Sequence, residues 1–187
     1  MMRLKENHMT MTGFADRIGR ALKVDASLYE EVEHDESALV QAMSIVALSS
    51  VATGVGAGTA LGLQGLVWNI FYAFIGWMFW AAVIYFVGTK VFGTPGTSTD
   101  MGELLRVLGF ASAPGIFRIF GVFSVVQPIV FIAVLIWMLV AMVIAVRQAL
   151  DYLSTGRAIA VCVVGLVLQL LIIALVTQIV QVLYVNV

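Results

Sequence analysis

Five long stretches that are almost free of charge occupy most of residues 38–185. A transmembrane helix needs about 20 mostly apolar residues to cross roughly 30 Å of hydrocarbon. The stretches run near residues 38–62, 66–87, 107–126, 128–146 and 158–184. The chain is 61% hydrophobic and 11% charged, whereas an ordinary soluble domain is about 25% charged. The sequence therefore predicts an all-α integral membrane protein with five transmembrane helices.

The positive charges predict the orientation of these helices. Lys and Arg accumulate on the cytoplasmic side of membrane proteins. Every Lys and Arg except Arg118 lies before the first span, between the second and third, or between the fourth and fifth. We therefore predict an N-in, C-out, multi-pass protein of the inner cell membrane. It would have a cytoplasmic head over residues 1–36 and a membrane domain over residues 37–187.

Residues 12–24 of the head have the pattern of a short amphipathic helix. Phe14, Ile18 and Leu22 recur at four-residue spacing, and Arg17 and Arg20 lie between them. Such a helix either lies on anionic lipid or packs against the spans, and the pattern does not separate the two. An acidic run follows within residues 30–36. We interpret it as a solvated linker whose charges favour the start of the next helix.

Small residues at every fourth position mark one face of the first span. They are Ser50, Gly54, Gly58 and Gly62. Small residues at this spacing let a second helix backbone approach closely. We predict a helix-packing groove here, filled by another span of this chain in preference to a second subunit. The bulky aromatic residues of the second span are the favoured occupant, and glycine-driven bending of the helix is the remaining interpretation.

The third stretch is interrupted by Pro114 and Arg118. Asp100 and Glu103 have the spacing of a helix start. In the geometry we favour, residues 100–113 lie along the cytoplasmic interface and residues 114–126 dip into the bilayer, so that Arg118 reaches back to the surface. In the alternative, one straight span places Arg118 near the midplane, where an arginine is costly and a functional candidate.

The fifth stretch carries Gln178 and Gln181 near its far end. We interpret these amides as partners in hydrogen bonds between helices, in preference to the lining of a transport path. On the cytoplasmic side, Arg106, Arg147 and Arg157 are predicted to anchor the spans. Arg147 and Asp151, four residues apart, would pair across the last inner loop.

The sequence carries none of the patterns that reactive sites require. No carboxylate lies within a confident span, and no metal-binding, phosphate-binding or Ser/His/Asp pattern is present. With one cysteine and a net charge of −1, neither a disulfide framework nor a nucleic-acid surface is expected. We predict no enzyme activity, no cofactor and no metal. The expected partners are membrane lipids and other integral membrane proteins or a second copy of the chain.

The polar positions between the later spans resemble those of a known family. They lie in the segment ELLRVLGFASAPGIFRIFG and in MVIAVRQALDYLSTGRAIAVCVVGLVLQ, and they are Arg106, Gly109, Phe110, Ala111, Pro114, Arg147, Ala149, Leu150, Ser154 and Ala158. In these residues the chain resembles the Yip (Ypt-interacting-protein) domain family, over roughly residues 13–185. The opening GFADRIGRALKVDASLYEEV resembles that of bacterial members.

The resemblance implies a small five-span protein with a cytoplasmic N-terminus. Eukaryotic members are associated with vesicle traffic and with small GTPases of the Rab type. Their N-terminal Asp-Leu-Tyr-Gly-Pro motif is missing here, because residues 26–30 read ASLYE. Small-GTPase binding is therefore not carried over to this chain.

These observations favour a non-enzymatic membrane scaffold or accessory subunit. A second hypothesis is a small transporter or channel, with Arg118 and the amides of Gln178 and Gln181 along a polar path. A third is a lipid-interacting protein that organises the membrane. Its basic head helix would bind anionic headgroups while the aromatic second span contacts acyl chains.

Overall fold

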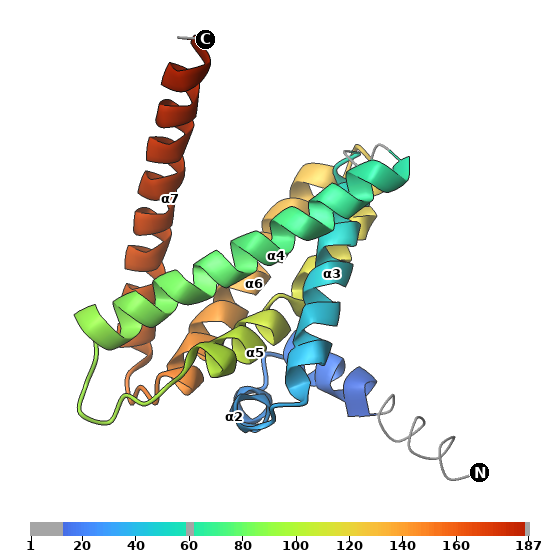
Figure 1. Ribbon diagram of the computed structural model, residues 1–187. Helices are drawn as coiled ribbons and strands as arrows, with labels where there is room; N and C mark the ends of the chain where they lie inside the picture. Colours follow the sequence, from blue (N-terminus) through green and yellow to red (C-terminus); the bar gives the residue numbers. More distant parts are fainter. Residues whose placement is uncertain (1–12, 59–61, 186–187) are drawn as a thin grey trace.

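The computed structural model describes residues 13–58 and 62–185, and within these ranges the fold is entirely helical. Residues 13–22 are helical, and the elements that follow are α2 (Ala26–His34), α3 (Ala38–Gly56), α4 (Gly62–Phe86), the π-helical turn η1 (Val87–Val91), α5 (Met101–Ala111), the 3₁₀ helix η2 (Ala113–Val122), α6 (Gln127–Ala149) and α7 (Thr155–Val185). Figure 1 shows their arrangement.

Five of the described helical segments are long and apolar enough to cross a membrane. They are Ala38–Gly56, Gly62–Val91, Met101–Val122, Gln127–Ala149 and Thr155–Gln178. The predicted fold class, an all-α protein with five membrane-spanning helices, is confirmed. The largest differences from the predicted bounds are the earlier end of the first span, the earlier start of the third and the earlier end of the fifth.

Local capping explains where α5 and η2 begin. The Asp100 carboxylate accepts a hydrogen bond from the Glu103 amide at 2.8 Å, and the Glu103 carboxylate accepts one from the Asp100 amide at 2.7 Å. This capping box satisfies two backbone donors at the start of α5, as the spacing predicted. Pro114 lies in the first turn of η2, where its missing amide proton costs nothing.

The head helix packs against the membrane bundle. Phe14, Ile18 and Leu22 are partly buried against the core cluster. Arg17 forms ion pairs with Glu31 at 2.8 Å and with Asp35 at 2.7 Å. Arg20 pairs with Asp25 and Glu31 as well. The structure therefore favours packing over lipid binding for this helix, and the acidic run neutralises the head's own arginines instead of forming a free linker.

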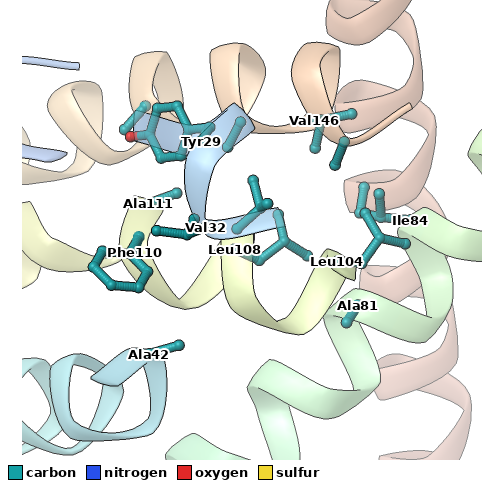
Figure 2. Close-up of a cluster of buried hydrophobic side chains, with 14 of the residues drawn as sticks. Tyr29, Val32, Ala42, Ala81, Ile84, Leu104, Leu108, Phe110, Ala111 and Val146 are labelled. Atoms are coloured by element: carbon teal, nitrogen blue, oxygen red, sulfur yellow. The ribbon is translucent and has the colours of Figure 1, made fainter. Parts of the chain in front are cut away.

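Helix α5 lies at the centre of the buried core (Figure 2). Leu104, Val107 and Phe110 on α5 are fully buried. Figure 2 shows Leu104 and Phe110 among side chains of the neighbouring helices, which are Tyr29 and Val32 of α2, Ala42 of α3, Ala81 and Ile84 of α4, and Val146 of α6. The core therefore gathers the head and the adjoining ends of three spans around one short helix.

Small residues join α3 to the α5–η2 segment. A Cβ atom built on Gly109 would lie 2.6 Å from the Cβ of Ala42, and one on Gly115 would lie 1.9 Å from the Ser49 hydroxyl. A Cβ on Gly56 would lie 1.8 Å from the backbone oxygen of Arg118. Only glycine permits contacts this close. Ala42, Ser49 and Gly56 therefore form the helix-packing face of α3, and the third span packs against it.

The prediction of a single small-residue face on the first span is wrong. That face was to consist of Ser50, Gly54, Gly58 and Gly62. Helix α3 ends at Gly56, and α4 begins at Gly62. Gly58 has a φ of +68° and Gly62 a φ of +70°, a left-handed conformation that glycine adopts without steric cost. The two glycines therefore allow the chain to leave α3 and to enter α4, and a Cβ built on either one meets no atom within 4 Å.

Helix α7 departs from the bundle along its C-terminal half (Figure 1). Its start is packed, with Ala158 and Val161 fully buried. Further along, Leu170, Leu171 and Leu175 are 57%, 62% and 62% exposed. The first turns of α7 thus belong to the core, whereas the later turns stand free of the other described helices.

Candidate functional site

Arg106 is buried and holds the end of the head against α5. Its Nε donates hydrogen bonds to the backbone oxygens of Val32 at 3.0 Å and Glu33 at 3.1 Å, and its Nη2 also donates to the Glu33 oxygen. These carbonyls belong to the last turn of α2, where helix carbonyls lack intrahelical partners. The sequence predicted an anchor at Arg106, and the structure identifies α2 as the element it contacts.

The loop after α6 is organised by Tyr152, which the sequence analysis missed. The Tyr152 hydroxyl donates to the backbone oxygen of Gly88 at 2.7 Å, and Arg147 Nε donates to the backbone oxygen of Tyr152 at 3.2 Å. The Arg157 guanidinium lies 5.6 Å from the centre of the Tyr152 ring. Arg147 and Arg157 therefore both contact Tyr152, whereas Arg106 contacts the head.

The predicted pair between Arg147 and Asp151 is wrong. None of the ion pairs among the described residues joins them, and Arg147 instead donates to the Tyr152 carbonyl and to the Thr155 hydroxyl. The reason is local. Helix α6 ends at Ala149, and Asp151 has a φ of +52°, so the helical spacing on which the pairing depended does not continue to Asp151.

Glu33 is a buried carboxyl at the contact between α2 and α5. Burial raises its pKa to about 7, and the negative charges of Asp151 and Glu103 add to the rise. The positive charge of His34 acts in the opposite direction. The carboxyl group is therefore largely protonated below neutral pH in the folded protein.

We expect Glu33→Gln to reduce the pH dependence of stability. The folded protein keeps the Glu33 proton at pH values where the unfolded chain has lost it. The free energy of unfolding therefore falls as pH rises from about 4.5 to about 7, by an amount on the order of 2–3 kcal/mol. Gln imitates the protonated form and avoids this loss. Melting temperatures of the two proteins in detergent, from pH 5 to pH 8, test the prediction.

Glu36→Gln is the control for this experiment, because Glu36 is exposed in the same head. Its melting temperature should follow that of the wild type at each pH. A Glu33→Gln variant that loses stability with rising pH as steeply as the control would contradict the assignment to Glu33.

One cavity between the spans is lined by residues of α3, α4, η2 and α6. Its volume is about 440 Å³, and its lining includes Ser50 and Gly54 of α3, Asn69 and Trp77 of α4, and Arg118 of η2. Arg118 Nη1 donates to the Thr53 hydroxyl at 3.4 Å, and the guanidinium lies 5.8 Å from the centre of the Phe131 ring. Arg118 thus brings a positive charge into a space between spans.

The favoured interfacial geometry required Arg118 to reach back to the head side. In the structure it does not. Its backbone lies beside Gly56, at the end of α3 remote from the head, and its side chain reaches Thr53. The reason is that η2 runs alongside α3 over this length, and Ser49 and Gly56 mark the two ends of that contact. The alternative of one straight span with Arg118 near the midplane is not matched in full either, because the segment divides into α5 and η2 and Arg118 lies among the spans beside the last residue of α3.

A second cavity of about 620 Å³ shares Trp80, Arg118, Met138 and Met142 with the first. The rest of its lining consists mostly of apolar side chains of α6 and α7. Cys162 and the amide of Gln169 also line it. The first cavity is largely apolar too, but it carries more polar groups than the second, so we call them the polar chamber and the apolar chamber; they adjoin at Arg118.

Gln178 and Gln181 are not part of either cavity. Both side chains are exposed on the later turns of α7, and Gln169 is the amide of α7 that faces the apolar chamber. The structure does not bring Arg118 and these two amides together. Asn69 was missed by the sequence analysis, although an amide inside an aromatic, apolar span was a signal that could have identified it.

A protein-family model matches most of this chain. The model of the Yip1 domain matches residues 29–176, which is most of the chain and includes α3, α4, α5, η2 and α6 entirely. The chain belongs to the Yip1 domain family. The match covers Arg106, Arg118 and Tyr152, so this Yip1 domain contains both the head contact and the two chambers. No curated protein and no solved structure matches the chain.

Proposed function

We propose that this Yip1 domain protein is a non-enzymatic scaffold or accessory subunit that packs against other integral membrane proteins. The observation that carries the proposal is the free C-terminal half of α7 (Figure 1). Leu170, Leu171 and Leu175 are each more than half exposed there. Packing against a neighbouring helix is the main source of helix association within lipid, and this stretch lacks such packing against the rest of the described chain.

The amides near the end of α7 support the same proposal. Gln178 and Gln181 are both exposed and lie three residues apart, so they share one side of the helix. Glutamine side chains form hydrogen bonds across membrane helices that contribute about 0.6–2 kcal/mol. A partner helix on this side of α7 would satisfy both amides.

We further propose that the protein is a bacterial-type member, placed N-in and C-out in the inner cell membrane. The one-sided distribution of Lys and Arg supports this orientation. The segment ASLYE at residues 26–30 supports the bacterial type. In this orientation the free half of α7 lies toward the outer leaflet.

Site-specific photocrosslinking in the native membrane tests the scaffold role. A photoreactive phenylalanine at Leu171, which is 62% exposed, should yield a covalent adduct with another membrane protein or with a second copy of the chain. The matched control is Ile136 on α6, which is 57% exposed and should yield adducts with lipid only. Lipid adducts alone at Leu171 would contradict the proposal.

A further inference from the structure

Three nitrogen donors without partners belong to residues that line the polar chamber. They are Asn69 Nδ2, Trp77 Nε1 and Arg118 Nε, each buried and without a hydrogen-bond partner in the structure. All three residues line the cavity of about 440 Å³. A buried donor left without an acceptor costs about 1–3 kcal/mol, and more when it is charged. Three such donors around one space therefore indicate that an acceptor-rich group occupies it.

The charge of Arg118 specifies the kind of acceptor. Among the described residues that line the two chambers there is no Asp or Glu. Around its guanidinium, the structure places the Thr53 hydroxyl at 3.4 Å and the Phe131 ring at 5.8 Å. Arg118 is partly buried, and a charge that is removed from water is usually paired with an opposite charge. Water would satisfy the donors but would leave the charge uncompensated, so the acceptor should be an anion.

The apolar chamber specifies what the anion is attached to. It adjoins the polar chamber at Arg118, has a volume of about 620 Å³, and runs between α6 and α7 past Leu139, Met142 and Leu166. A free anion would use the polar chamber alone. A molecule with an anionic head and a hydrocarbon tail would use both.

We propose that this protein binds one anionic lipid between its spans. The phosphate or carboxylate of the lipid accepts hydrogen bonds from Arg118, Asn69 and Trp77, and an acyl chain lies between α6 and α7. This site is separate from the proposed protein contact on the later turns of α7. It also differs from the surface of the head, where Arg17 and Arg20 are already paired with carboxylates.

Lipid binding to the purified full-length chain in neutral detergent tests the proposal. Phosphatidylglycerol and oleate should raise the melting temperature, whereas phosphatidylcholine and oleyl alcohol should not. Arg118→Gln should weaken phosphatidylglycerol binding at least about tenfold, which corresponds to the loss of roughly 1.4 kcal/mol. Arg157→Gln is the control, because Arg157 is exposed and lies outside both chambers.

Two further arms keep the test decisive. Trp77→Phe removes the indole donor and keeps a smaller aromatic ring, so it should weaken binding several-fold even if Arg118→Gln does not fold. A diazirine on the acyl chain should label Met142 or Cys162, which are partly buried in the apolar chamber. Equal binding of phosphatidylglycerol and phosphatidylcholine, or labels confined to the head, would overturn the proposal. Equal protection by inorganic phosphate alone would overturn the assignment to a lipid.

Discussion

Gly56→Ala should destabilise the protein more than any other alanine substitution of a described helical glycine. The new Cβ would lie 1.8 Å from the backbone oxygen of Arg118 and 2.8 Å from its carbonyl carbon. A backbone cannot rotate away as a flexible side chain can, so α3 and η2 must separate. Overpacking of this kind costs about 1–3 kcal/mol and occasionally more. The separation would also shift Gly56 from Gln127, whose amide donates to the Gly56 oxygen at 2.8 Å.

The measurement is thermal unfolding in detergent, followed by a thiol-reactive fluorophore. Cys162 is the only cysteine of the chain and is partly buried, so it reacts as the protein opens. Gly76→Ala on α4 is the matched control, since its Cβ would meet no atom within 4 Å. Alanine is favoured over glycine inside a helix by about 0.5–1 kcal/mol, so the control should melt no earlier than the wild type. Equal melting temperatures for the two variants would show that α3 and η2 are not in contact at Gly56.

The sequence was sufficient to predict those features that depend on neighbouring residues. The five apolar segments follow from length and hydropathy, because a bilayer imposes the same requirement on every span. The capping box at Asp100 and Glu103 follows from a spacing of three residues. In both cases the determining interactions lie within one segment of the chain.

The packing register was not predictable in the same way. The stripe from Ser50 to Gly62 assumed that the first helix continues through Gly58, whereas α3 ends at Gly56. The observed contact face uses Ala42, Ser49 and Gly56, seven residues apart, which is also a helical repeat. Two repeats of small residues were present in one sequence, and only the position of the third span distinguishes them.

The residues that line the polar chamber were still harder to predict from the sequence. Asn69 and Trp77 come from α4 and Arg118 from η2, far apart along the chain. The sequence identified Arg118 as costly inside a membrane but paired it with Gln178 and Gln181, which lie elsewhere on α7. Side chains from different spans meet only through tertiary packing, so their convergence needed the structure.

Arg106→Leu should release the head from the membrane domain. Arg106 is 7% exposed, and its guanidinium donates to the carbonyls of Val32 and Glu33 through two different nitrogens. A hydrogen bond to a charged group contributes about 1.5–3 kcal/mol, so the loss should be about 3 kcal/mol. Arg106→Lys keeps the charge but not the planar set of donors, and we expect it to lose an intermediate amount of stability.

Limited trypsin digestion and thermal unfolding together test this expectation. Lys23 is exposed in the turn before α2, and cleavage there should accelerate in Arg106→Leu because α2 no longer holds the head against α5. Arg157→Leu is the control, since Arg157 is exposed and its guanidinium lies over the Tyr152 ring. Wild-type behaviour of Arg106→Lys would mean that charge alone holds α2. Because Arg106 lies on α5 at the centre of the core, a detached head would also expose Leu104 and Phe110 and lower the melting temperature. Cleavage at Lys23 that does not accelerate in Arg106→Leu, or an unchanged melting temperature, would contradict the contact described for α2.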